Sequence, residues 1–174
     1  SEPGAGALFD VGIYPINTAR WMFDALPTNA YANALRRDGS SADEISTIVL
    51  SFPGERLAVI DCALTLGYRN HYDIIGTNGS IYVDRPYASP PFQPGRDGLV
   101  TRITTSSGDA AGAERIADVD QYRLEIEAFD KGVRGDNSDL YPTTESAADA
   151  AVLAACLASM RSGKPEAVAL PTNP

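Results

Sequence analysis

The spacing of apolar residues changes twice along this chain, and these changes limit the folds that it can adopt. From Leu8 to Phe23, apolar residues recur at steps of three to five, which is the spacing of a helix with one buried face. Between residues 30 and 83 the chain has short runs rich in β-branched residues, which are typical of strands. Helical spacing returns from Tyr122 to Val133. This order predicts an α+β fold, with an open, largely antiparallel sheet and helices packed on one of its faces.

Turn signals set the boundaries of the first predicted elements. Gly12 and Pro15 lie inside the first helix, and since proline removes a backbone hydrogen bond, we expect a kink or a later start there. The runs that we predict as strands cover residues 30–37, 45–52, 57–66, 72–75, 80–83, 99–105 and 115–119. Four consecutive strands joined by turns imply an antiparallel meander.

The second half of the chain contains two predicted loops and two predicted helices. Residues 86–98 are rich in proline and glycine, and residues 106–112 have the composition of a mobile tip. The predicted helices cover 122–134 and the alanine-rich run from Pro142 to Met160, and glycine follows each of them.

We find no repeat or linker and therefore expect one domain over residues 1–174. A sheet covered by helices on one face needs a second cover, which a partner subunit or another domain would supply.

Composition excludes several classes of function. The 174 residues carry a formal net charge of −9, so a nucleic acid backbone or an anionic membrane surface would be repelled. No apolar run approaches the roughly 20 residues that a membrane helix needs. Cys62 and Cys156 lie in apolar runs and form no CxxC pair, which favours buried thiols over a disulfide framework. We therefore expect a cytoplasmic protein with no nucleic acid or membrane partner.

Several common catalytic devices do not occur in this sequence. The segment Gly4-Ala5-Gly6 lacks the third glycine of a dinucleotide fingerprint and precedes every predicted strand, so we do not interpret it as a cofactor loop. The single histidine, His71, excludes a histidine-rich metal site and a Ser-His-Asp triad within one chain. We interpret His71 as a polar residue at the start of a strand, with a place in a pocket lining as the alternative.

The remaining polar candidates lie on the first predicted helix. Asp10, Tyr14 and Asn17 are four and three residues apart, which places them on one helix face. A carboxylate, a phenol and an amide side by side can hold the hydroxyls of a polyol while the phenol passes a proton. The alternative is that these residues are only the solvated face of an amphipathic helix.

Longer strings in the chain resemble a known family. Residues 4–17, GAGALFDVGIYPIN, resemble the signature that opens the substrate-side domain of the glucose–fructose oxidoreductase, inositol dehydrogenase and rhizopine-catabolism family. That signature is small-Gly-Gly-x-Leu-x-Asp-x-Gly, then His or Tyr, then two residues and Asp or Asn. Residues 72–81, YDIIGTNGSI, are similar to the family's strand–Gly-Thr-x-Gly–strand hairpin, and QYRLE at 121–125 and ESAADA at 145–150 are similar to its closing helices.

The resemblance implies a domain like the C-terminal domain of glyceraldehyde-3-phosphate dehydrogenase, in an oxidoreductase acting on the CH–OH group of a sugar or trans-dihydrodiol. It implies that Asp10 and Asn17 bind the substrate and that Tyr14 transfers a proton. It places Tyr122 near the nicotinamide or the substrate, with a core aromatic as the alternative. Tyrosine and asparagine at positions 14 and 17 resemble the branch with D-xylose dehydrogenase and dimeric dihydrodiol dehydrogenase, which implies NADP and a homo-oligomer formed through the sheet face.

The same resemblance implies that this chain is part of a longer enzyme. The family's glycine-rich cofactor loop and its Glu-Lys-Pro lysine belong to an amino-terminal Rossmann domain, and Lys164-Pro165 has no glutamate before it. We therefore expect a piece that lacks the Rossmann domain and is inactive alone. Two alternatives are a non-catalytic sugar-binding sensor or scaffold of the same family, and a module that serves only in oligomerisation.

Overall fold

The computed structural model describes residues 5–87, 101–116, 120–137 and 139–170. The chain divides into two units by its internal contacts, and each is described by itself. Unit 1 comprises Ser1–Gly67 and Tyr141–Pro174, and unit 2 comprises Tyr68–Leu140.

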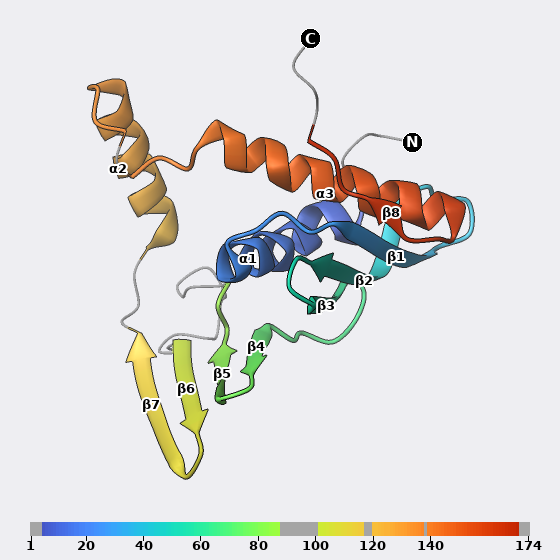
Figure 1. The fold of residues 1–174 in the computed structure, drawn as a ribbon. Helices are drawn as coiled ribbons and strands as arrows, with labels where there is room; N and C mark the ends of the chain where they lie inside the picture. The colour runs from blue at the N-terminus through green and yellow to red at the C-terminus, as the bar shows by residue number, and fades with distance from the viewer. Residues whose placement is uncertain (1–4, 88–100, 117–119, 138, 171–174) are drawn as a thin grey trace. The chain divides into compact units, whose positions relative to one another are not determined.

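Unit 1 contains one antiparallel sheet and the helices that cover it (Figure 1). Its elements are the π-helical turn η1 (Leu8–Gly12), α1 (Ile13–Phe23), β1 (Asn29–Arg36), β2 (Asp43–Phe52), β3 (Arg56–Ala63), α3 (Thr143–Ser162) and the two-residue strand β8 (Glu166–Ala167). The strand order is β3-β2-β1-β8. All neighbouring strands run antiparallel.

Alternation of side chains along the strands explains why the helices cover only one face of this sheet. From Ser46 to the end of β2 the buried side chains occur at every second position, and Ile48 and Leu50 are completely buried. Helix α3 packs on β1, and its alanine-rich sequence allows a close approach. At that contact the Ser159 hydroxyl accepts a hydrogen bond from the Ala32 amide at 2.9 Å, so an edge group of β1 is satisfied by the covering helix.

The opposite face of the unit 1 sheet carries exposed apolar side chains. Tyr31, Leu35, Leu57 and Val59 all lie on it, and Val59 is 75% exposed. The strand register aligns Tyr31, Val49 and Val59 in one row across β1, β2 and β3. Residues from β1 and β2 line a shallow groove on this face. Within the described residues of unit 1, this face of the sheet is therefore open.

Unit 2 contains a second antiparallel sheet, in the order β4-β5-β6-β7, and one helix. Its elements are β4 (His71–Gly76), β5 (Gly79–Asp84), β6 (Thr101–Ser107), β7 (Ala110–Ile116) and α2 (Gln121–Val133). The Asp120 side chain accepts a hydrogen bond from the Arg123 amide at 3.0 Å and so caps the start of α2.

The structure confirms the predicted α+β class, the predicted helices and the helix stop signals. Gly163 ends α3 in the left-handed conformation, with φ +69°. The first helix starts at Leu8 as the periodicity predicts, but its first five residues are π-helical. Pro15 has no N–H for the Val11 carbonyl, and the wider turn precedes it.

Other predictions differ from the structure. The strands form two sheets, so the expected meander is divided after β3. The predicted loop over 106–112 is wrong, because β6 and β7 continue to a tight turn at Gly108-Asp109, where Gly108 supplies a positive φ. Strand β8 was not predicted, because two residues carry no periodicity. Most of the predicted loop over 86–98, from residue 88 onward, lies outside the described residues.

Candidate functional site

Two of the three predicted site residues of the first helix, Asp10 and Tyr14, lie on its outer side, and the third, Asn17, is half-buried and faces α3. Asp10, in η1, is exposed, and Tyr14, in α1, is 51% exposed. The inner side is a buried stripe at every fourth position, formed by Leu8, Gly12, Ile16 and Arg20. A spacing of four residues falls between the repeats of an α-helix and a π-helix. The π-helical turn therefore keeps Asp10 close to the line of Tyr14, and such turns are frequent at functional sites.

The start of this helix is fixed by a carboxylate from the sheet. Asp43, a buried residue of β2, accepts a hydrogen bond from the Leu8 amide at 2.8 Å and another from the Ser46 hydroxyl at 2.6 Å. Gly6 has φ +110°, and a Cβ atom there would lie 2.1 Å from Asp43 Oδ1. The glycine before the helix is therefore needed both for its backbone conformation and for the close approach of Asp43.

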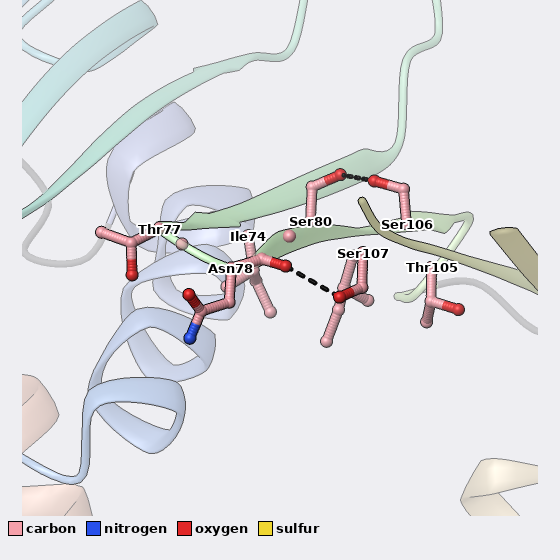
Figure 2. A pocket seen from close by; sticks show the side chains of 10 residues that line it. Ile74, Thr77, Asn78, Ser80, Thr105, Ser106 and Ser107 are labelled. Carbon is pink, nitrogen blue, oxygen red and sulfur yellow. Dashed lines mark hydrogen bonds between the residues drawn. The ribbon is translucent and has the colours of Figure 1, made fainter. Parts of the chain in front are cut away.

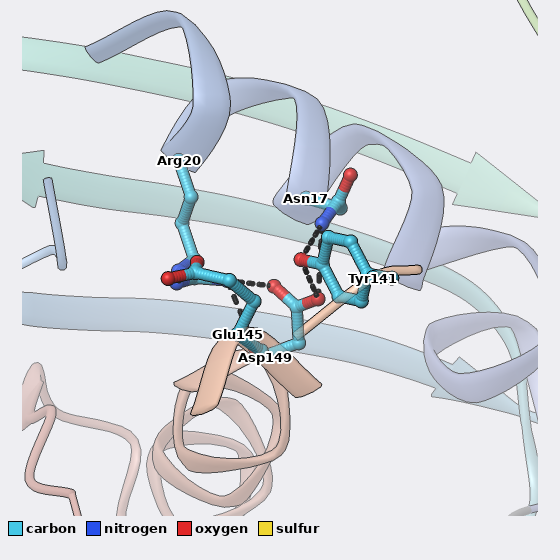
Figure 3. A network of polar contacts seen from close by, with 5 residues as sticks. All are labelled: Asn17, Arg20, Tyr141, Glu145 and Asp149. Carbon is cyan, nitrogen blue, oxygen red and sulfur yellow. Dashed lines mark hydrogen bonds and ion pairs between the residues drawn. The ribbon is translucent and has the colours of Figure 1, made fainter. Parts of the chain in front are cut away.

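The helix is also anchored near its other end, by an ion-pair cluster (Figure 3). Arg20 is only 7% exposed. Its guanidinium donates to Asp149 and, at 2.6 Å, to Glu145 Oε2, and both acids lie in α3. Burial alone would lower the pKa of Arg20, but the hydrogen bonds and charges of Asp149 and Glu145 raise it above its ordinary value. The cluster therefore fastens α1 to α3.

Asn17 belongs to the same cluster. Its amide nitrogen donates to Asp149 Oδ2 at 3.0 Å and to the Tyr141 hydroxyl. The Tyr141 hydroxyl in turn donates to Asp149 Oδ2 at 3.0 Å. Burial and then this hydrogen bond raise the pKa of Tyr141, which keeps the phenol protonated as a donor. One carboxylate thus receives hydrogen bonds from three side chains.

The other two predicted site residues belong to unit 2. His71 is the exposed first residue of β4, as predicted. The centroid of its ring lies 5.5 Å from the centroid of the Tyr82 ring. Tyr122 is 49% exposed in the first turn of α2, so it is not a core aromatic within the described residues. Their roles in a site remain predictions.

Unit 2 also has a shallow depression at the β4–β5 turn, with several hydroxyl side chains in its lining (Figure 2). The hydroxyls of Ser80 and Ser106 lie 2.8 Å apart, and Ser107 donates to the Asn78 carbonyl at 2.9 Å. A Cβ atom at Gly79 would lie 2.1 Å from the Ser106 carbonyl oxygen. The glycine of this hairpin is therefore required by the close approach of β6, and the hydroxyls bind to one another or to backbone.

Comparison with known proteins identifies the family of this chain. Residues 1–82 match the family model described as the GFO/IDH/MocA C-terminal domain. An uncharacterized oxidoreductase of Rhizobium meliloti is 36% identical over 136 residues, which are 75% of this chain and 39% of that protein. The chain belongs to the GFO/IDH/MocA family.

Two further GFO/IDH/MocA relatives have named activities. D-xylose 1-dehydrogenase (NADP⁺) of Haloarcula marismortui is 30% identical over 130 residues, which are 72% of this chain and 34% of that protein. Trans-1,2-dihydrobenzene-1,2-diol dehydrogenase of Danio rerio is 37% identical over 81 residues, which are 46% of this chain and 24% of that protein. The chain spans well under half the length of the relatives that it matches.

Solved structures agree on the fold. Aldose-aldose oxidoreductase from Caulobacter crescentus, complexed with glycerol, has a TM-score of 0.78 at 18% identity, covering 94% of this chain and 48% of that one. A mutant 3-ketoreductase from Actinomadura kijaniata, in complex with TDP-benzene and NADP, has a TM-score of 0.78 at 20% identity, covering 90% of this chain and 48% of that one. At these identities the likeness establishes the fold alone.

The glycine-containing start of the first helix does not fit a phosphate of NADP. The Asp43 carboxylate already accepts the hydrogen bond of the Leu8 amide there, and its negative charge would repel a phosphate. Within the described part of the chain, no three His, Cys, Asp or Glu side chains are grouped to hold a metal ion. None of the helices described has the length and apolar character to cross a membrane.

Sequence reasoning missed the residues that anchor this helix at its two ends. They are Asp43 at its start, and Arg20, Tyr141, Glu145 and Asp149 in the ion-pair cluster near its other end. One signal was available: Arg20 continues the four-residue spacing of Leu8 and Ile16, which places a charge on the buried stripe and requires a buried counter-ion.

Proposed function

We propose that this chain is the substrate-binding part of an NADP-dependent oxidoreductase that acts on the CH–OH group of a sugar or a trans-dihydrodiol. The observation that carries the proposal is the polar line of Asp10, Tyr14 and Asn17 along a helix anchored at both ends. The activities printed for D-xylose 1-dehydrogenase and dihydrodiol dehydrogenase support the substrate class.

Each residue of this line has a separate role in the proposal. Asp10 carries only acceptor atoms when ionised, and it would accept hydrogen bonds from substrate hydroxyls. Asn17 would bind a further hydroxyl. Tyr14 both donates and accepts, so it would take the proton of the hydroxyl at the reacting carbon. Tyr122 is an additional candidate for a contact with the substrate, supported by the sequence resemblance only. His71, at the start of β4, is a further candidate as a pocket-lining residue.

NADP would be bound by a part of the protein outside this chain. The Asp43 carboxylate leaves no anion site at the glycine-containing helix start, and the curated relatives are more than twice as long as the matched segment. We therefore expect this chain alone to be inactive and the longer protein to be active. The two free, buried cysteines fit a reducing compartment such as the cytoplasm.

The open face of the unit 1 sheet supports a second role in the same protein. We expect it to pair with another copy of the chain, because Leu35, Leu57 and Val59 are more than 60% exposed on one apolar surface. A family member that binds sugar without reacting, or that only dimerises, would use the same sheet face to pair with another copy. It would not need the proton transfer proposed for Tyr14.

The test is NADP-dependent oxidation of a panel of aldoses and trans-dihydrodiols, measured on the full-length protein and on this chain side by side. Activity in the full-length protein alone would support a site divided between two domains and would identify the substrate class. Absence of activity in both, with sugar binding retained, would replace the enzyme by the non-catalytic alternative.

A further inference from the structure

The hydrogen bonds of Asn17 determine which end of its amide faces α3. Figure 3 shows the amide nitrogen directed at Tyr141 and Asp149 and the oxygen directed away from both. Asp149 is a buried residue of α3, at 7% exposure, so its carboxylate is not free to turn toward water. The contact between the two residues joins positions 132 apart in the chain.

Its two partners leave the Asn17 amide only one orientation in which both hydrogen bonds form. The Asp149 carboxylate is paired with the Arg20 guanidinium and offers only acceptor atoms. The Tyr141 hydroxyl donates its hydrogen bond to Asp149, so toward Asn17 it also offers only a lone pair. A flipped amide would place Oδ1 against two acceptors and lose both hydrogen bonds.

We propose that Asp149 is a positioning residue that holds the Asn17 amide with its carbonyl oxygen outward, so that Asn17 offers a ligand a hydrogen-bond acceptor and no donor. The inference rests on the proposed function, and it specifies the polarity of that site. Asp10 is likewise acceptor-only as a carboxylate. The two residues on either side of Tyr14 then both require hydroxyl donors, and a ligand group that can only accept is rejected at both.

The orientation is tested directly by NMR on the full-length protein labelled with ¹⁵N-asparagine. Asn17→Ala assigns the side-chain signal, and Asn78, exposed in the β4–β5 turn, serves as the internal reference. We expect the Asn17 side-chain protons to exchange with solvent about tenfold more slowly than those of Asn78, since a hydrogen bond to a charged group protects them. Equal exchange rates in the wild-type protein would overturn the inference.

Variants separate the positioning residue from its neighbours. Asp149→Leu removes the acceptor and should bring the Asn17 exchange rate to that of Asn78. Glu145→Gln is the matched control, because it removes the other ion pair of Arg20 and leaves Asp149 in place; slow exchange should persist. If Asp149→Leu does not fold, the wild-type exchange rate and the Glu145→Gln control still decide the orientation.

Ligand polarity is tested with D-xylose and its monodeoxy and monodeoxyfluoro derivatives in the NADP-dependent assay. Both kinds of derivative lack the hydroxyl donor at the substituted position, and fluorine keeps only acceptor character. At the position that meets Asn17, both should therefore lower kcat/KM by about tenfold to a hundredfold. In Asn17→Ala this difference should disappear at that position. Fluoro derivatives that match D-xylose at every position would overturn the acceptor assignment.

The two arms distinguish the two proposals. If neither D-xylose nor any other member of the panel is oxidised, the proposed function fails, and the exchange rate of Asn17 still decides the orientation of its amide. If the sugars are oxidised and Asn17 exchanges as fast as Asn78, the enzyme proposal stands and the positioning role of Asp149 is rejected.

Discussion

The buried Asp43 carboxylate accepts a hydrogen bond from the Leu8 backbone amide at 2.8 Å, across 35 positions of sequence. This contact joins strand β2 to the first turn of the helix that carries Asp10 and Tyr14. It also requires a residue without Cβ at Gly6, where φ is +110°. The family motif glycine is therefore explained by packing against a carboxylate.

Gly6→Ala is expected to destabilise the protein by about 3 kcal/mol, because the new Cβ meets Asp43 Oδ1 and the backbone conformation is strained for alanine. The measurement is the free energy of unfolding in urea. Gly163→Ala is the control: Gly163 has φ +69° but nothing within 4 Å of its Cβ position, so only the strain of about 1 kcal/mol remains. Equal losses in both variants would argue against the Asp43 contact.

The Arg20–Asp149 pair predicts strong coupling in a double-mutant cycle. Arg20→Met or Asp149→Leu alone leaves a buried charge without its partner and should cost about 3–5 kcal/mol, whereas the double variant should cost less than the sum. The exposed Arg123–Glu127 pair is the control, because an i,i+4 surface pair contributes about 0.3–0.5 kcal/mol. Coupling as small as that of the surface pair would contradict the anchoring of α1 to α3.

Val59→Lys is expected to convert a dimer of the full-length protein into a monomer. Val59 is 75% exposed on the open sheet face, so a lysine there costs the monomer little but places a charge in an apolar interface. Light scattering after size-exclusion chromatography measures the mass. Leu66→Lys, at an exposed position after the end of β3, should leave the mass unchanged. A dimer that persists in Val59→Lys would remove the sheet face from the interface.

Periodicity predicted the elements of this fold better than their arrangement. The helix from Leu8 to Phe23 and the helix stop at Gly163 follow from local spacing and from the left-handed conformation that glycine favours. The division of the strands into two sheets depends on which strands pair, and alternation within one strand does not encode its partner. Strand β8 exists only because β1 offers an edge to Glu166 and Ala167.

The candidate site was likewise predictable from the sequence only in part. Spacing alone placed Tyr14 and Asn17 on one helix, and the structure confirms that position. The partner of Asn17 was not predictable, because Asp149 lies 132 positions away on a helix whose alanine-rich sequence gives no sign of a buried acid at that position. Local patterns identify a polar face, whereas tertiary contacts decide which of its atoms a ligand can use.

The two buried thiols predict a loss of stability at alkaline pH. Burial, followed by the charges of Asp43 and Asp61, raises the pKa of Cys62 from 9.0 to about 11, and burial raises the pKa of Cys156 to about 12. Between pH 9 and 11 the unfolded chain therefore releases thiol protons that the folded chain keeps. The free energy of unfolding should fall by about 1.4 kcal/mol per pH unit for each thiol. In Cys62→Ala this slope should be smaller, and an unchanged slope in urea titrations would contradict the shift.

Tyr14→Phe tests the chemistry of the site most directly. The variant keeps the ring, which is half-exposed on α1, and removes only the hydroxyl that is proposed to take the substrate proton. In the full-length protein, kcat should fall by about 10² to 10⁴, the usual contribution of a positioned proton-transfer group, with little change in KM. Tyr31→Phe, on the far face of the sheet, controls for loss of a tyrosine hydroxyl elsewhere and should keep wild-type kcat. A rise in KM at constant kcat would instead make Tyr14 a binding residue, and the proton would then have to leave through a group outside this chain.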